Sequence, residues 1–235
     1  MNKNRIWYIP AAFFAVCCIL NLTGCLDYSS NALERAVKPA LMPLLCITTL
    51  AFLLQKGALL PGTALLVCGQ LFGFAGDTML MGKGFPFFAG GIGLFLTGHI
   101  FYICLFGGQS WKGLKPWQWA AAIAVMLGGT AALALGIGVN GVMLGPMGVY
   151  GFVLMMLIFS GLAGVLRPGA VKGGSRCTWW IILCGALLFT FSDALIAVRN
   201  FGNLSPFMSG FGVMSTYLAA QTLLAVGGVR LIRNK

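Results

Sequence analysis

Long apolar stretches separated by short polar breaks dominate the chain. Eight of these stretches are candidate membrane-crossing helices, at residues 6–26, 39–54, 59–80, 87–106, 117–139, 142–166, 179–198 and 207–231. A helix needs roughly 20 mainly apolar residues to cross the hydrocarbon core of a bilayer. The pattern therefore predicts an all-α integral membrane protein, a bundle of eight transmembrane helices that forms one polytopic domain over residues 1–235.

The polar breaks contain residues that commonly end or begin helices. Gly82-Lys83-Gly84 follows the third stretch, and Arg167-Pro168-Gly169 follows the sixth. Pro39 is expected to open the second helix, because proline is well tolerated in a first turn. Only Asn140-Gly141 separates the fifth stretch from the sixth, so this boundary is the least marked of the seven.

The composition excludes a soluble fold. Hydrophobic residues make up 59% of the 235 residues and charged residues only 8%, whereas a soluble domain is about 25% charged. Intrinsic disorder is excluded by the same figures, since disordered chains are poor in apolar residues and rich in charge.

The charges are few and unevenly placed. Fifteen Lys and Arg stand against four Asp and Glu. Eleven bases fall at the two termini and in alternate loops, and four fall in the other loops, at Arg35, Lys38, Lys83 and Arg199. The positive-inside rule then predicts that both termini are cytoplasmic, and we expect a multi-pass protein of a bacterial inner membrane. The bases lie between apolar stretches and form no basic domain, so they indicate contacts with membrane lipids and no nucleic-acid partner.

The cysteines do not form a recognisable metal or disulfide pattern. There are eight cysteines but no CxxC, and His99 is the only histidine. We therefore expect no metal site and no cofactor. Leu22-Thr23-Gly24-Cys25 resembles the end of a lipoprotein signal, with Cys25 as the lipidated residue. We expect an uncleaved first helix instead, because cleavage would remove one helix from the bundle.

Two acidic residues lie inside predicted spans, Asp77 in the third and Asp193 in the seventh. A charge near the centre of a spanning helix costs about 2.5–3.5 kcal/mol. The presence of both acids inside predicted spans therefore needs an explanation. Each lies in the last turns of a helix that runs in the same direction, which places both near the outer face. Thr63, Gln70 and Asp77 recur every seven residues, and Thr190, Asp193 and Asn200 share one side of their helix.

Further polar residues are candidates for the same site. Lys38 and Arg199 belong to the outer layer with the two carboxylates, and His99, Tyr102, Tyr217 and Gln221 lie deeper. Each also has a purely structural interpretation. Asp77 could cap a turn, Asp193 could pair with Arg199, and Lys38 could anchor its helix at the interface. His99, Tyr217 and Gln221 could simply form hydrogen bonds between helices.

Short motifs along most of the chain resemble the YhhN family, whose characterised members are lysoplasmalogenases. The matching segments, in the family's order, are Lys38-Pro39 with Met42-Pro43, Gly76-Asp77-Thr78-Met79-Leu80, His99-Ile100-Phe101-Tyr102 with Phe106, Ser192-Asp193 with Ala197 and Phe201, and Tyr217 with Ala220-Gln221. The fifth and sixth stretches match only as generic apolar helices, so the resemblance assigns no site residue there.

The resemblance implies hydrolysis of the vinyl-ether bond of a lysoplasmalogen, a lysophospholipid, to a fatty aldehyde and a glycerophospho-headgroup. This chemistry needs an acid to protonate carbon, negative charge near the oxocarbenium ion and a base for water. Two adjacent carboxyl groups suit it, because one can stay protonated while the other is ionised. On this hypothesis Asp77 and Asp193 share the acid and base roles, in an order that the sequence leaves open.

The remaining candidates take supporting roles on the same hypothesis. Lys38 or Arg199, with Asn200, would bind the phosphate, while His99, Tyr102, Tyr217 and Gln221 would position water or the ether oxygen. The alternatives are a small proton-coupled transporter, in which intramembrane Asp and His relay protons, and a non-catalytic lipid-binding protein. A closed pocket shared by the two aspartates favours hydrolysis, and a polar track across the bundle favours transport.

Overall fold

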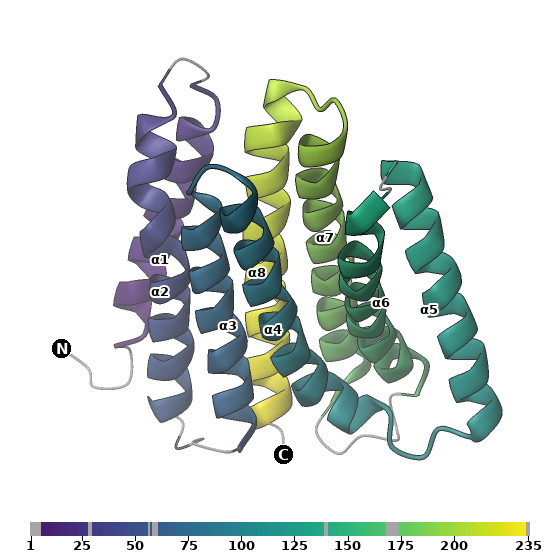
Figure 1. Ribbon diagram of the computed structural model, residues 1–235. Coiled ribbons are helices and arrows are strands. Elements are labelled where there is room, and N and C mark those ends of the chain that lie inside the picture. The colour runs from purple at the N-terminus through teal and green to yellow at the C-terminus, as the bar shows by residue number, and fades with distance from the viewer. Residues whose placement is uncertain are drawn as a thin grey trace.

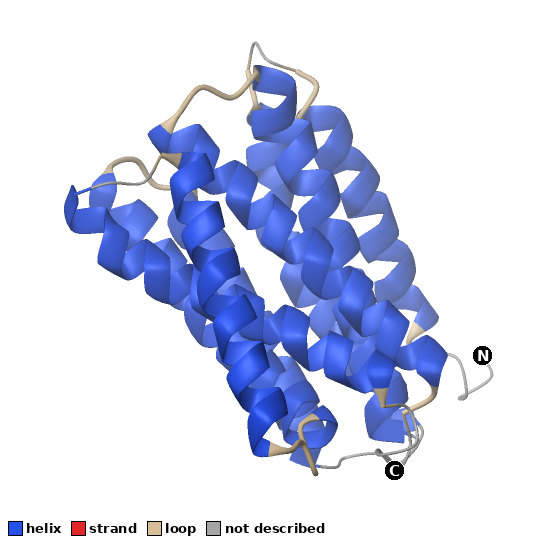
Figure 2. Ribbon diagram, turned by 90° about the vertical axis from the view of Figure 1, so that its right-hand side faces the viewer, coloured by secondary structure: helices blue, strands red, loops and turns tan. Residues whose placement is uncertain are grey.

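Helices are the only regular elements in the described part of the chain (Figures 1 and 2). The computed structural model describes residues 6–27, 30–55, 57, 61–138, 141–167 and 174–233. The α-helices are α1 (Tyr8–Gly24), α2 (Ala32–Gln55), α3 (Pro61–Leu80), α4 (Phe85–Ser110), α5 (Pro116–Ile137), α6 (Leu144–Leu166), α7 (Arg176–Phe201) and α8 (Val213–Arg233). A 3₁₀ turn, η2 (Gly141–Met143), precedes α6, and a π-helical turn, η4 (Met208–Gly212), precedes α8.

The helices run alternately up and down, so that α1 begins and α8 ends at the same end of the bundle (Figure 1). Successive helices pack together in the pairs α1–α2, α2–α3, α3–α4, α5–α6, α6–α7 and α7–α8. Two further features close the bundle. Helix α6 packs against α4, and α8 also contacts α1, α2 and α3. Helix α5 lies at the edge, held mainly by α6.

Seven of the eight described α-helices are long and apolar enough to cross a membrane. The exception is α1, which is apolar but has only 17 residues. The chain is therefore a multi-pass, all-helical membrane protein. Eight complete spans and cytoplasmic termini remain predictions from the sequence.

The second helix begins earlier than the sequence predicts. Pro39 was expected to open this helix, but α2 starts at Ala32 and contains both Pro39 and Pro43. Helices inside membranes tolerate proline because neighbouring helices and local adjustments satisfy the freed backbone groups. Glu34 also lies in the first turn, where a negative charge complements the helix dipole. As a result, Lys38 lies within α2 and not in front of it.

Side chains hold α1 onto α2. The Asn21 side chain is fully buried and its Nδ2 donates to the Glu34 carbonyl over 3.3 Å. A Cβ at Gly24 would lie 2.5 Å from the Glu34 nitrogen, so the two backbones touch there. Cys25 is itself buried, with 2% of its surface exposed. This packing supports the expectation that α1 remains part of the bundle.

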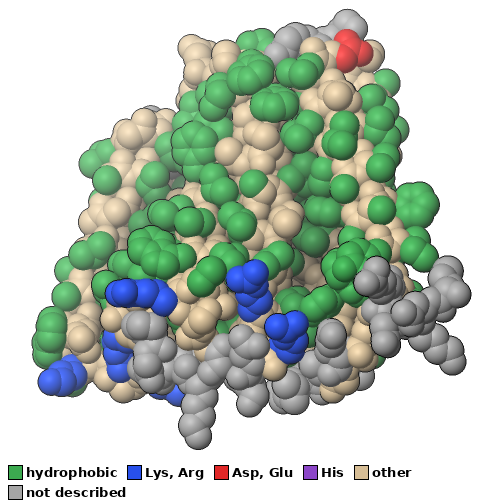
Figure 3. Space-filling view, turned by 180° about the vertical axis from the view of Figure 1, so that it is seen from behind, with side chains coloured by type: hydrophobic (Ala, Val, Ile, Leu, Met, Phe, Trp, Pro, Cys, Tyr) green, Lys and Arg blue, Asp and Glu red, His purple; other side chains and the backbone are tan. Residues whose placement is uncertain are grey.

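Six of the ten described bases lie at one end of the bundle, and several are visible at the bottom of Figure 3. We call this the basic end; its described bases are Lys112, Lys115, Arg167, Arg176, Arg230 and Arg233. The other bases used above to predict the orientation, Lys3, Arg5, Lys56, Lys172 and Lys235, lie outside the described residues. Two acidic residues lie at the opposite end. Asp27 lies in the connection between α1 and α2, and Glu34 lies in the first turn of α2.

Close approach of α6 to α7 depends on Gly161. A Cβ there would lie 2.8 Å from the Leu183 Cα and 3.0 Å from its nitrogen, and backbone atoms cannot rotate away. We expect Gly161→Ala to destabilise the protein by about 1–3 kcal/mol through overpacking. Thermal unfolding in detergent measures this. Gly128→Ala on α5 is the matched control, because no atom lies within 4 Å of its added Cβ. Equal melting temperatures for the two variants would contradict the prediction.

Candidate active site

A buried chain of hydrogen bonds surrounds Asp77 and joins three helices. Tyr217 Oη on α8 donates to Asp77 Oδ2 on α3 over 2.6 Å. Gln221, one turn further along α8, donates from Nε2 to Tyr217 Oη over 3.3 Å. Tyr102 on α4 completes the chain, since its hydroxyl donates to Gln221 Oε1 over 2.7 Å. All four side chains are at most 4% exposed.

Glycines on α3 make room for this chain. A Cβ at Gly73 would lie 2.9 Å from Gln221 Nε2. A Cβ at Gly69 would lie 2.6 Å from the Tyr102 ring, and one at Gly76 would lie 2.9 Å from the Phe95 ring. The side of α3 that bears Asp77 is therefore lined with small residues, which lets long polar side chains from α4 and α8 reach it.

Asp193 forms a second buried cluster, on α7. Tyr150 Oη on α6 donates a short hydrogen bond to Asp193 Oδ2. His99 on α4 faces the same oxygen, with Nε2 3.9 Å away. Neither ring nitrogen of His99 has a hydrogen-bond partner within the described residues, and nor does Asp193 Oδ1. The cluster therefore has unused donors and acceptors in a buried place, which is typical of sites that bind a polar reactant.

Aromatic rings lie between the two clusters. The Phe189 ring contacts His99 at a centroid distance of 4.4 Å and Tyr217 at 5.5 Å, both edge to face. Phe95 contacts Phe189 and Tyr217 at 6.3 and 5.9 Å. The rings keep the surroundings of both carboxyl groups apolar. Phe189 thus contacts both His99, which faces Asp193, and Tyr217, which bonds Asp77.

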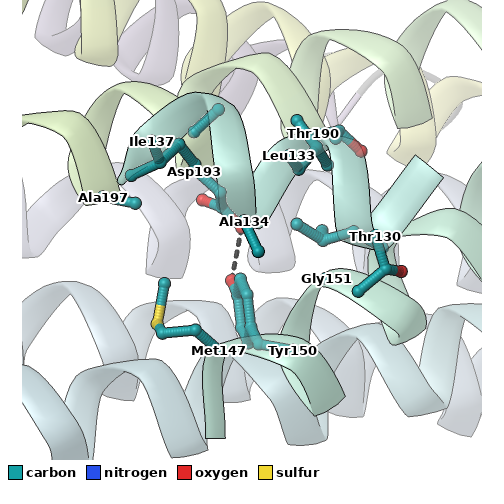
Figure 4. Close-up of a pocket in the computed structure, with 12 residues that line it drawn as sticks. Thr130, Leu133, Ala134, Ile137, Met147, Tyr150, Gly151, Thr190, Asp193 and Ala197 are labelled. Atoms are coloured by element: carbon teal, nitrogen blue, oxygen red, sulfur yellow. Dashed lines mark hydrogen bonds between the residues drawn. The ribbon is translucent and has the colours of Figure 1, made fainter. Parts of the chain in front are cut away.

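A small cavity of about 30 Å³ adjoins Asp193 (Figure 4). It lies between α5, α6 and α7, and its polar lining residues are Thr130, Tyr150, Thr190 and Asp193. Its other walls are mostly apolar, with Leu133 and Ile137 from α5 among them. Asp77 does not line this cavity, so the expectation that both aspartates share one hollow is not met there: Asp77 faces Tyr217 on the other side of the aromatic rings.

Lys38 lies near the Asp77 cluster, whereas two other predicted site residues lie elsewhere. The charges of Lys38 and Asp77 interact, and Lys38 is half-buried on α2. Arg199 and Asn200 instead border a separate cavity of about 340 Å³ with Leu80, Phe85 and Phe88. Asn200 Nδ2 donates to the carbonyl of Ile196 in its own helix over 2.7 Å. Arg199 Nη1 donates to the Ser209 carbonyl over 3.5 Å, and no ion pair joins Arg199 to Asp193 within the described residues.

Tyr150 is the site residue that the sequence did not reveal. It lies in the sixth apolar stretch, where no motif matched, yet within the described residues it is the one side chain that forms a hydrogen bond with the Asp193 carboxyl group. A tyrosine inside a spanning helix is a weak signal, because tyrosine is common near membrane interfaces. Its importance appears only when α6 and α7 are packed together.

The π-helical turn η4 positions Tyr217. In a π-helix one extra residue enters the turn, and such turns occur frequently at functional sites. Here the turn ends directly before Val213, whose carbonyl accepts a hydrogen bond from Ser192 Oγ over 3.1 Å. Ser192 precedes Asp193, so the same contact holds α7 and the start of α8 in register. Tyr217, one turn later, then points toward Asp77.

The chain is similar in sequence to curated lysoplasmalogenases over most of its length. The chain is 27% identical to bovine (Bos taurus) lysoplasmalogenase TMEM86A, over 92% of this chain and 87% of that protein. It is 29% identical to human (Homo sapiens) lysoplasmalogenase TMEM86B, over 95% and 87%. It is 31% identical to mouse (Mus musculus) lysoplasmalogenase TMEM86B, over 80% of this chain and 73% of that protein.

No solved structure matches the chain. A family model does, and it is described as the YhhN family and covers residues 33–228. The matched region runs from the first turn of α2 to the last turns of α8 and so includes both aspartate clusters. The chain belongs to the YhhN family.

Proposed function

We propose that the protein is a membrane hydrolase that cleaves the vinyl-ether bond of a lysoplasmalogen to a fatty aldehyde and a glycerophospho-headgroup. The observation that carries the proposal is the buried Asp193 cluster: the ring nitrogens of His99 and one oxygen of Asp193 have no hydrogen-bond partner within the described residues, and Asp193 borders a small cavity. The relatives named lysoplasmalogenases support the reaction class. Buried acids within membrane-spanning helices are expensive and are usually functional.

The reaction needs one proton donor, one water molecule and one proton acceptor. An acid protonates the β-carbon of the vinyl ether, and the electron pair of the double bond forms the new C–H bond. The resulting oxocarbenium ion is attacked by water at the carbon that bears the ether oxygen, and the water loses a proton to a base. The hemiacetal then collapses: its hydroxyl group loses a proton to a base and forms the C=O bond of the aldehyde, the C–O bond to glycerol breaks, and the glycerol oxygen takes a proton from an acid.

We assign the proton transfers to the Asp193 cluster. In its protonated form Asp193 gives its proton to carbon, and the carboxylate that remains stabilises the oxocarbenium ion. His99, 3.9 Å from Asp193 Oδ2, is placed to hold the water and accept its proton. Tyr150 is a positioning residue, because its hydrogen bond fixes Oδ2 of Asp193, while Oδ1 has no hydrogen-bond partner within the described residues.

Asp77 then has an electrostatic role on the far side of Phe189. Its negative charge favours the developing cation, and Tyr217, Gln221 and Tyr102 hold it in place through their hydrogen bonds. Lys38 is the cation whose charge acts on this carboxylate. We assign Lys38 to the phosphate and leave Arg199 and Asn200 out of the site, since both face another cavity.

The proposal is tested by incubating the purified protein with a lysoplasmalogen and, separately, with its saturated alkyl-ether analogue. Free aldehyde should appear with the vinyl ether alone, because a saturated ether has no carbon that can be protonated to an oxocarbenium ion. Absence of aldehyde from both lipids, with folded protein, would refute hydrolysis.

Tyr150→Phe removes the hydroxyl that holds Asp193 while keeping the ring. A hydrogen bond to a charged group contributes about 1.5–3 kcal/mol, so we expect kcat to fall roughly 10- to 100-fold with little change in KM. The pH profile of kcat should also change, because the hydrogen bond acts on the titrating carboxyl group. A variant with lower thermal stability but an unchanged kcat and pH profile would show that Tyr150 is only structural. Tyr8→Phe is a matched control, since Tyr8 is half exposed on α1.

A further inference from the structure

A larger cavity lies at the basic end of the bundle, away from both aspartates. It has a volume of about 470 Å³ and lies between the start of α1, the end of α2 and the end of α8. Its walls include the rings of Trp7, Phe14 and Phe52, with Leu45 and Val226. The volume is within the range of small-molecule sites, about 300–1,000 Å³. We call it the basic-end cavity.

The interior of the basic-end cavity is effectively apolar. Three threonines line it, but each hydroxyl donates to a carbonyl of its own helix. Thr48 bonds the Leu44 carbonyl over 2.7 Å, Thr49 bonds that of Leu45 over 2.9 Å, and Thr222 bonds that of Leu218 over 2.7 Å. Their methyl groups and the aromatic rings remain to contact an occupant. Such a wall suits a hydrocarbon chain and not a polar solute.

Two arginines border the same cavity. Arg230 and Arg233 are spaced i, i+3 on α8, so they lie on one face of the helix. Arg230 Nη1 approaches the Cys177 sulfur at 3.8 Å, which is a weak contact for a guanidinium. The chain has only four acidic residues, and none lies near this end: Asp27 and Glu34 are at the opposite end, and Asp77 and Asp193 lie deep in the two clusters described above. No acidic side chain therefore neutralises these arginines.

We propose that the basic-end cavity binds an anionic phospholipid of the surrounding bilayer. One acyl chain lies between α1, α2 and α8, and the phosphate is held by Arg230 and Arg233. The guanidinium fork matches phosphate geometry, and basic pockets between transmembrane helices commonly bind anionic headgroups. The lipid would join the short helix α1 to α2 and α8. This site is separate from the Asp193 cavity and does not depend on the proposed hydrolysis.

Lipid retention by the purified protein tests the charge contacts. Native mass spectrometry is carried out in detergent with added phosphatidylglycerol or phosphatidylcholine. We expect the wild type to retain phosphatidylglycerol preferentially, and R230Q/R233Q to bind at least fivefold less of it. K112Q/K115Q is the matched control, because it removes the same charge from the same end at residues outside the cavity. Equal losses in both double variants, or no loss in R230Q/R233Q, would overturn the proposal.

Filling the cavity tests the acyl-chain contacts without changing charge. Ala225→Leu and Ala11→Phe each add side-chain atoms to its wall. Ala11 is half-buried, so it tolerates a larger residue even where the buried Ala225 does not. A folded filling variant should retain at least fivefold less phosphatidylglycerol. Retention equal to that of the wild type would exclude an acyl chain in the cavity. Displacement of the lipid by millimolar inorganic phosphate would show that the arginines bind a free anion instead.

Discussion

Asp193→Asn is expected to lower kcat at least 100-fold while leaving the protein folded. The amide keeps the size of the carboxyl group and can still accept the hydrogen bond from Tyr150, but it has no acidic proton to give to carbon. General acid catalysis contributes about 10²- to 10⁴-fold to such reactions, and this carboxyl group is the one that lines the cavity. Aldehyde release from a lysoplasmalogen, per mole of folded protein, measures the effect.

Asp27→Asn is the control for this prediction. Asp27 is an exposed acid between α1 and α2, and its Oδ2 accepts a hydrogen bond from Ser30 over 2.7 Å. The substitution makes the same change from carboxyl group to amide at a residue that does not line the cavity, so activity should remain within twofold of the wild type. If the Asp193 variant kept more than half of the wild-type activity, the assigned proton donor would be wrong.

Asp77→Asn is expected to have the second largest effect, a 10- to 100-fold loss of kcat. Its carboxylate does not line the Asp193 cavity, so the loss reflects removal of a nearby negative charge and of the acceptor for Tyr217. A buried charge acts strongly across a short apolar distance because little water screens it. The same aldehyde assay measures the loss, with thermal unfolding as the check on folding.

A double-mutant cycle separates the two contributions of Asp77. Tyr217→Phe removes the hydrogen bond and keeps the charge, so it should cost less activity than Asp77→Asn. The double variant should be no worse than Asp77→Asn alone, because the two residues share one interaction. Additive losses would show that Tyr217 acts independently of Asp77. A fall in melting temperature without loss of kcat in Asp77→Asn would mean that this acid is only structural.

The sequence predicted the helices well because the rule that produces them is local. A run of apolar residues long enough to cross a bilayer becomes a helix whatever its neighbours do. The fifth and sixth stretches are indeed two helices, α5 and α6, although the two residues immediately before Gly141 lie outside the described residues. The error at Pro39 has a local cause as well: proline was interpreted with the rules of water-soluble helices, whereas α2 continues through it.

The candidate site was predictable only in part, because it depends on which helix faces which. Acidic residues stand out in an apolar chain. Asp77 and Asp193 could therefore be identified from the free-energy cost of placing a charge inside a spanning helix. Periodicity also indicated the polar side of α3. The same spacing argument placed Asn200 on the side of α7 that bears Asp193. The Asn200 side chain instead donates a hydrogen bond to a carbonyl of its own helix.

Tyr150 and Phe189 are residues whose roles in the site could not be predicted from the sequence. Neither residue carries a charge or belongs to a recognised motif that names it, so nothing in the chain singles them out. Their roles arise from packing between α4, α6, α7 and α8, which brings residues of distant segments within one hydrogen bond or one ring contact. One sequence does not specify such pairings.

The position of α5 has a consequence for how reaction products would separate. Helix α5 is the least buried of the seven long helices, and it forms one wall of the cavity beside Asp193. Movement of α5 away from its neighbours would open this cavity sideways into hydrocarbon, whereas the ends of the bundle lead toward water. With the proposed chemistry, an insoluble aldehyde would diffuse directly into the lipid and the charged headgroup would leave by the aqueous side. Because the aldehyde and the headgroup would leave in different directions, they would rarely recombine.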